Sequence, residues 1–125
     1  VWASGLPIDL VPLDATRQAM LLRGELMAAL ATTPGPVATR IAAFTERGFR
    51  VDRQGGARGM ILHDPLAVGV AVDPTLVTWE QARLTVGPEG ETRRAGGGTN
   101  CRVARVVHRE RFLSAFLARL CPASS

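Results

Sequence analysis

The stretch that most constrains this chain is residues 59–74, where a short apolar segment meets two polar residues and then a long apolar run. It reads Gly-Met-Ile-Leu-His-Asp-Pro-Leu-Ala-Val-Gly-Val-Ala-Val-Asp-Pro. Pro65 suits the first position of a helix, and Asp64 before it can accept hydrogen bonds from the first free amides. The run 66–72 has no polar face, so as a helix it is predicted to be buried on all sides. The helix should end before Asp73-Pro74, because a proline disfavours helical conformation in the preceding residue.

This pattern places His63 and Asp64 at the start of a buried helix, where packing holds side chains in fixed positions. That makes the pair a candidate for chemistry. However, an Asp-Pro pair that opens a helix is also ordinary capping, and a lone histidine is commonly a packed or solvated residue. The residues by themselves leave both interpretations open.

Composition and charge narrow the class of protein. The chain has 125 residues, 46% of them hydrophobic, which favours one modest domain with a core and argues against disorder. No apolar stretch approaches the roughly 20 residues that span a bilayer, and the N-terminus lacks a signal-peptide pattern. The sequence therefore predicts a cytoplasmic protein without a membrane partner.

The net charge is +4, and all 15 basic residues are arginine. These arginines are scattered among acidic residues, whereas a nucleic-acid interface requires clustered charge, so we expect no nucleic-acid partner. Cys101 and Cys121 are too few and too far apart for a zinc site, and we expect two reduced, partly buried thiols.

The remaining elements follow from hydrophobic periodicity and from the positions of glycine and proline. Buried or half-buried strands are predicted at 8–11, 79–86 and 101–107, and helices at 25–31, at 36–48 and around 112–120, with Gly48 ending the second helix. Residues 14–16 form a turn at the carboxyl end of the first strand, where ligands gather in α/β sheets. Asp14 is thus a candidate supporting group or an ordinary turn residue. Residues 49–58 and 91–99 are predicted to be irregular.

Two motifs in this order resemble the inosine/uridine-preferring nucleoside hydrolases. The first reads Gly-Leu-Pro-Ile-Asp-Leu-Val-Pro-Leu-Asp-Ala-Thr at 5–16, and the second reads Leu-His-Asp-Pro-Leu-Ala-Val at 62–68. The resemblance extends from about Trp2 to Leu120 and is to the C-terminal half of that family's domain. It implies an α/β fold, with residues 1–125 as the C-terminal part of an open, mostly parallel, Rossmann-like sheet with flanking helices, incomplete as given.

The resemblance also implies an activity, hydrolysis of the base–ribose bond of ribonucleosides in nucleoside catabolism and salvage. In the family a Ca²⁺ ion holds the ribose hydroxyls and the attacking water. Asp64 corresponds to one ligand of that ion, and His63 to the histidine proposed to protonate the leaving base. The segment before His63 closes over the base in the family, and here it offers Arg53, Gln54 and Arg58 but no Tyr or Trp. The full-length protein is expected to be a homo-oligomer.

One departure from the family pattern leaves alternatives open. The Asp-x-Asp-x-x-x-Asp-Asp loop that supplies most Ca²⁺ ligands does not occur in residues 1–125, and the ribose-binding Asn segment would precede Val1. The chain is therefore expected to hold half of a hydrolase site and to be inactive alone. The alternatives are a non-catalytic remnant or interaction domain that keeps the fold, and a basic binding module.

Overall fold

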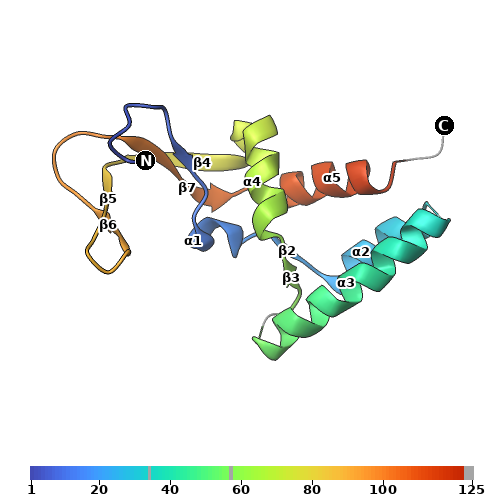
Figure 1. Ribbon diagram of the computed structural model, residues 1–125. Helices are drawn as coiled ribbons and strands as arrows, with labels where there is room; N and C mark the ends of the chain where they lie inside the picture. The colour runs from blue at the N-terminus through green and yellow to red at the C-terminus, as the bar shows by residue number, and fades with distance from the viewer. Residues whose placement is uncertain (34, 57, 123–125) are drawn as a thin grey trace.

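A computed structural model describes residues 1–33, 35–56 and 58–122 and contains both strands and helices (Figure 1). In chain order the elements are β1 (Asp9–Leu10), α1 (Leu13–Thr16), β2 (Met20–Leu21), α2 (Arg23–Ala31), α3 (Pro36–Gln54), β3 (Met60–Ile61), α4 (His63–Val72), the 3-10 helix η1 (Pro74–Leu76), β4 (Val77–Ala82), β5 (Leu84–Val86), β6 (Thr92–Arg94), β7 (Cys101–Val107) and α5 (Arg109–Leu120). The predicted α/β class with flanking helices is confirmed.

The main sheet has the strand order β1-β7-β4. β1 runs parallel to β7, as expected for the first strand, with Asp9 opposite Arg102. β4 runs antiparallel to β7, so the sheet within this chain is mixed. β1 is also shorter and less buried than predicted, since Asp9 is exposed. One edge of this strand pairs with β7, and that pairing fixes the N-terminal motif against the C-terminal strand.

Two small antiparallel pairs, β2-β3 and β5-β6, complete the strands. The prediction of one strand over 79–86 is wrong, because β4 ends at Ala82 and β5 begins at Leu84. The prediction that residues 91–99 are irregular is wrong over β6. The chain reverses in a turn closed by the Gly90 N–H and the Gly87 carbonyl, with Gly90 at φ +85°, and this turn brings β6 back onto β5.

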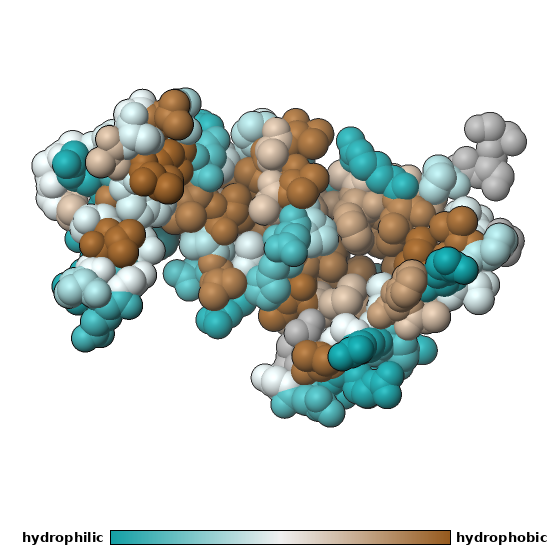
Figure 2. Space-filling view, viewed as in Figure 1, coloured by the Kyte–Doolittle hydropathy of each residue, from teal (hydrophilic) through white to brown (hydrophobic). Residues whose placement is uncertain are grey.

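The main core contains buried side chains from all five α-helices and from β2, β4 and β7. Its largest fully buried side chains are Leu21, Leu26, Leu66 and Phe112. The prediction that α4 is buried on all sides is wrong. Leu66 and Val70 are buried, whereas Val68 and Val72 are 64% and 68% exposed. Within the described residues the helix packs on one side only, and Figure 2 shows hydrophobic side chains at the surface in the region of α4.

α3 does not end at Gly48 but continues to Gln54. Gly48 has a packing role, because a Cβ at this position would lie 2.5 Å from the Met60 sulfur of β3. Residues 49–54, predicted to be irregular, therefore belong to the helix, and Phe49 is buried against the core. Local sequence suggested a helix stop, whereas the tertiary approach of β3 explains the glycine.

Two other predictions concern location and cysteine chemistry. Within residues 1–33, 35–56 and 58–122, no helix has both the length and the apolar character needed to cross a membrane. Cys101 and Cys121 are both free thiols, as predicted, with Cys101 buried and Cys121 half-buried. Burial raises the pKa of the Cys101 thiol, which makes it a poor nucleophile.

Candidate active site

α4 begins at His63, two residues earlier than Pro65 predicts. Leu62 is the residue before the helix, and no side chain caps it. The prediction that Asp64 caps the helix is therefore wrong, because Asp64 already lies within the first turn. At that position its charge interacts favourably with the positive end of the helix dipole, which is typically a smaller effect than a capping bond. The carboxylate is exposed and forms no hydrogen bond or ion pair with the described residues.

His63 is half-buried and contacts a second helix. Its Nδ1 lies 2.7 Å from the Thr16 Oγ1, across 47 residues of sequence. Thr16 is the last residue of α1 and only 4% exposed. The sequence placed Thr16 in the motif of residues 5–16 but assigned it no function. The structure therefore joins the two motifs at a single hydrogen bond.

Backbone pairing brings these two side chains together. β2 pairs with β3 in antiparallel register, with Met20 opposite Ile61. The Leu62 N–H then donates to the Ala19 carbonyl at 2.9 Å, which extends this pairing to the residue before His63. The end of α1 and the start of α4 are consequently held at fixed positions relative to each other.

The other site residues predicted from sequence are not gathered at His63. Arg53 and Gln54 lie in the last turn of α3, and Arg58 follows the turn after it; all three are exposed. Asp14 is exposed in α1, and its carboxylate has no hydrogen-bond partner among the described residues. No group of three or more His, Cys, Asp or Glu side chains that could hold a metal ion occurs in the part of the chain that the structure describes. The described residues therefore do not by themselves form a Ca²⁺ site.

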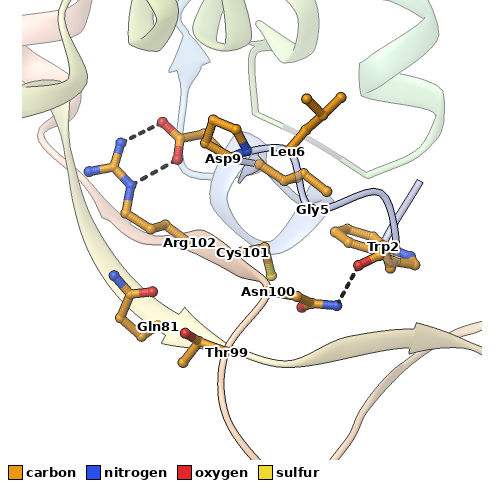
Figure 3. Close-up of a pocket in the computed structure, with 11 residues that line it drawn as sticks. Trp2, Gly5, Leu6, Asp9, Gln81, Thr99, Asn100, Cys101 and Arg102 are labelled. Atoms are coloured by element: carbon orange, nitrogen blue, oxygen red, sulfur yellow. Dashed lines mark hydrogen bonds and ion pairs between the residues drawn. The ribbon is translucent and has the colours of Figure 1, made fainter.

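A cavity of about 730 Å³ lies elsewhere, between the N-terminal segment and the adjoining ends of β4 and β7 (Figure 3). Three of the polar side chains that line it, Asp9, Asn100 and Arg102, are already paired. Arg102 makes two hydrogen bonds to the Asp9 carboxylate, at 2.8 and 2.5 Å, and they hold the pKa of Asp9 below its usual range. The Asn100 amide bonds the backbone of Trp2 and Leu84. These contacts are structural, so the cavity is a weaker candidate for chemistry than the start of α4.

A half-buried ion pair supports the elements around the site. Arg109, the first residue of α5, donates to the Glu25 carboxylate at 2.7 and 2.9 Å and to the Met20 carbonyl at 2.8 Å. Glu25 also accepts the Leu22 N–H at the start of α2. Burial alone would raise the pKa of Glu25, but these hydrogen bonds and the charge of Arg109 together lower it.

Glu25→Gln should therefore destabilise the fold near neutral pH, by about 1–2 kcal/mol because the lost bonds are charge-assisted and partly solvated. The ionised carboxylate stabilises the fold above the ordinary carboxyl range, and this contribution is lost as pH falls through the lowered pKa of Glu25. Denaturant unfolding at pH 7 and in acid should show a smaller pH dependence for the variant. Glu46→Gln, in the exposed pair with Arg23, is the matched control and should change stability by less than about 0.5 kcal/mol. Equal effects of the two substitutions would contradict this assignment.

Comparison with known proteins decides the family. Residues 1–114 match the family of inosine-uridine preferring nucleoside hydrolases. The chain belongs to this family. Its resemblance in motifs 5–16 and 62–68 is thus confirmed as a true family relationship.

Individual nucleoside hydrolases agree with this assignment. The chain is 30% identical over 93 residues to the pyrimidine-specific ribonucleoside hydrolase RihA of Shewanella woodyi, covering 73% of this chain and 30% of that protein. The purine-preferring ribonucleoside hydrolase from Gardnerella vaginalis is similar in structure, with a TM-score of 0.81 and 32% identity over 96% of this chain and 41% of its own. A plant nucleoside hydrolase shares the fold, with a TM-score of 0.83 and 23% identity over 97% of this chain and 43% of its own. The chain thus spans less than half the length of these relatives.

Proposed function

We propose that residues 1–125 form the C-terminal portion of a single domain that hydrolyses the base–ribose bond of ribonucleosides. The relatives include a part that this chain does not match. We use the name complete hydrolase for a protein in which residues 1–125 are joined to that part. The observation that best supports the proposal is the arrangement at the start of α4. There a hydrogen bond from α1 holds His63, and an exposed carboxylate follows directly at Asp64.

His63 is proposed as the acid that protonates the leaving base. A histidine suits this task because its unperturbed pKa lies near neutrality, and a positioned acid contributes rate wherever the leaving group is poor. Arg53, Gln54 and Arg58 stay proposals for contacts to the base. Homo-oligomer formation also stays a prediction.

Asp64 is proposed as one oxygen ligand of a Ca²⁺ ion in the complete hydrolase. Ca²⁺ takes six to eight oxygen ligands, and its carboxylate ligands are ionised. Asp64 fits one such position because it is exposed and has no ion-pair partner among the described residues. The described residues contain no group of three or more His, Cys, Asp or Glu side chains that could hold a metal ion. The other ligands are therefore proposed to come from the rest of the complete hydrolase.

A second candidate is a non-catalytic remnant or interaction domain that keeps the packing of the family but lacks the metal site. The two candidates differ in what completion of the domain restores. If the enzyme proposal is right, the complete hydrolase should cleave inosine or uridine and should lose that activity to a chelator. If the remnant proposal is right, the complete hydrolase should cleave neither substrate.

The 125-residue chain alone should show no measurable nucleosidase activity and should bind Ca²⁺ no more tightly than about millimolar, because a single carboxylate is a weak Ca²⁺ site. Activity is measured as release of free base from inosine and uridine, and binding by calorimetry with Ca²⁺. Asp64→Asn is the control for any weak binding that is observed. Chelator-sensitive hydrolysis by the 125-residue chain would contradict the prediction.

A further inference from the structure

Thr16 is the buried polar side chain that contacts the candidate acid. Its Oγ1 has two neighbours, the His63 Nδ1 at 2.7 Å and the Leu13 carbonyl oxygen at 3.3 Å. A hydroxyl has one proton to donate and lone pairs that accept, whereas a carbonyl can only accept. Both contacts are therefore satisfied together when the hydroxyl donates to the Leu13 carbonyl and accepts a proton from Nδ1.

α1 is held firmly enough for this contact to define the position of the ring. The Gln18 side chain follows α1 and donates to the Arg105 carbonyl at 2.8 Å, while its own oxygen accepts the Val107 N–H at 3.1 Å. These two bonds tie the end of α1 to β7. The buried Ala15 packs in the core beside Thr16. Thr16 is thus attached to the sheet, and His63 is attached to Thr16.

A histidine acts as a general acid in its protonated form, which carries a proton on both ring nitrogens. Nδ1 then donates to the Thr16 hydroxyl, and within the described residues Nε2 has no hydrogen-bond partner. Nε2 is therefore the nitrogen left to give its proton to the leaving base. That transfer leaves a neutral ring with its proton on Nδ1, which keeps the bond to Thr16.

We propose that Thr16 is a positioning residue for His63: its hydroxyl donates to the Leu13 carbonyl, accepts the Nδ1–H, fixes the imidazole ring, and leaves the Nε2–H of the protonated ring for the substrate base. The statement about the ring stands on the geometry of this chain. The statement about the base rests on the proposed function. Thr16 itself does not contact the reacting atoms in this assignment.

The ring nitrogens report the bond directly. In the 125-residue chain, ¹⁵N NMR of the imidazoles at a pH where both are neutral should show His63 with a protonated Nδ1 and an unprotonated Nε2. The chain has two histidines, and the exposed His108 is the internal control, expected to show an average of the two tautomers. Thr16→Ser keeps the hydroxyl and should keep the His63 pattern. Thr16→Val keeps the shape without the hydroxyl and should shift His63 toward the averaged pattern.

Two results would overturn the proposal. One is an unprotonated Nδ1 on His63 in the unsubstituted chain, a measurement that does not depend on any variant folding. The other is a Thr16→Val variant that keeps its backbone spectrum and leaves the His63 ring shifts unchanged. A threonine that only fills space would give the second result.

The complete hydrolase then tests the functional part. Thr16→Val should lower kcat for inosine about tenfold or more, a size typical of misplaced catalytic groups, with KM little changed and a smaller loss for nitrophenyl riboside. Thr16→Ser should restore most of the rate. If the unsubstituted complete hydrolase cleaves nothing, the proposed function fails while the ring shifts still decide the Thr16–His63 bond. If the unsubstituted complete hydrolase is active and Thr16→Val slows hydrolysis of both substrates by the same factor, only the positioning function of Thr16 is overturned.

Discussion

His63→Ala should slow hydrolysis of inosine by the complete hydrolase about 10²–10⁴-fold, the contribution expected of a positioned general acid. A purine leaves poorly without a proton, so its departure depends on the acid. Nitrophenyl riboside has an activated leaving group that needs no proton, and its hydrolysis should change little. The measurement is the ratio of the two rates in the variant and in the unsubstituted enzyme. If both substrates lose activity equally, His63 is not the leaving-group acid and its function is structural.

Asp64→Ala is the comparison that separates the two neighbours, because it removes the proposed metal ligand and leaves the acid in place. It should weaken Ca²⁺ binding and lower the rate for both substrates together. Its effect on stability should be small, about 0.3–1 kcal/mol, because only the interaction of an exposed charge with the helix dipole is lost. A cap bond is not involved, since none is formed by Asp64 in α4. A variant with unchanged Ca²⁺ affinity would remove Asp64 from the proposed ligand set.

Phe112→Ala should cost about 3–5 kcal/mol of unfolding free energy, which is much of the stability of a domain of this size. Phe112 is 2% exposed and belongs to the main core. A Cβ on Gly69 of α4 would lie 3.1 Å from its ring, which shows how closely α4 and α5 approach each other. Removing the ring leaves a cavity under α4, the helix that begins with His63. Denaturant unfolding of the 125-residue chain measures the change.

Phe44→Ala is the matched control for the loss of a phenylalanine side chain. Phe44 is 73% exposed on α3, so its removal should change the unfolding free energy by less than about 0.5 kcal/mol. Comparable losses for the two substitutions would show that Phe112 is not a core residue in solution.

Several features could be predicted from local sequence because they depend on neighbouring residues. Pro74 ends α4 before Asp73, and β7 occupies the predicted range 101–107. The free state of both cysteines was predicted from the lack of a signal-peptide pattern, and their number and spacing argued against a zinc site. The first family motif ends at residue 16 and the second begins at residue 62. Together they indicated the correct family.

Other features depend on which elements meet, and local sequence does not contain that information. Gly48 has the sequence character of a helix stop, yet it lies inside α3, where it faces the Met60 side chain of β3. Val68 and Val72 are apolar enough for a core, yet they are exposed because α4 packs on only one side within this chain. Burial is a property of the neighbours that a residue acquires in the fold.

The start of α4 shows both parts of this division. The sequence by itself determined that a histidine and an aspartate stand at the beginning of a helix and that an Asp-x-Thr segment lies far upstream. Only the tertiary structure decided that Thr16 contacts His63, because the β2-β3 pairing and the Leu62–Ala19 hydrogen bond set the distance between them. This pairing joins two-residue strands that are separated by α2 and α3, so it depends on how those helices pack and not on a pattern within either strand.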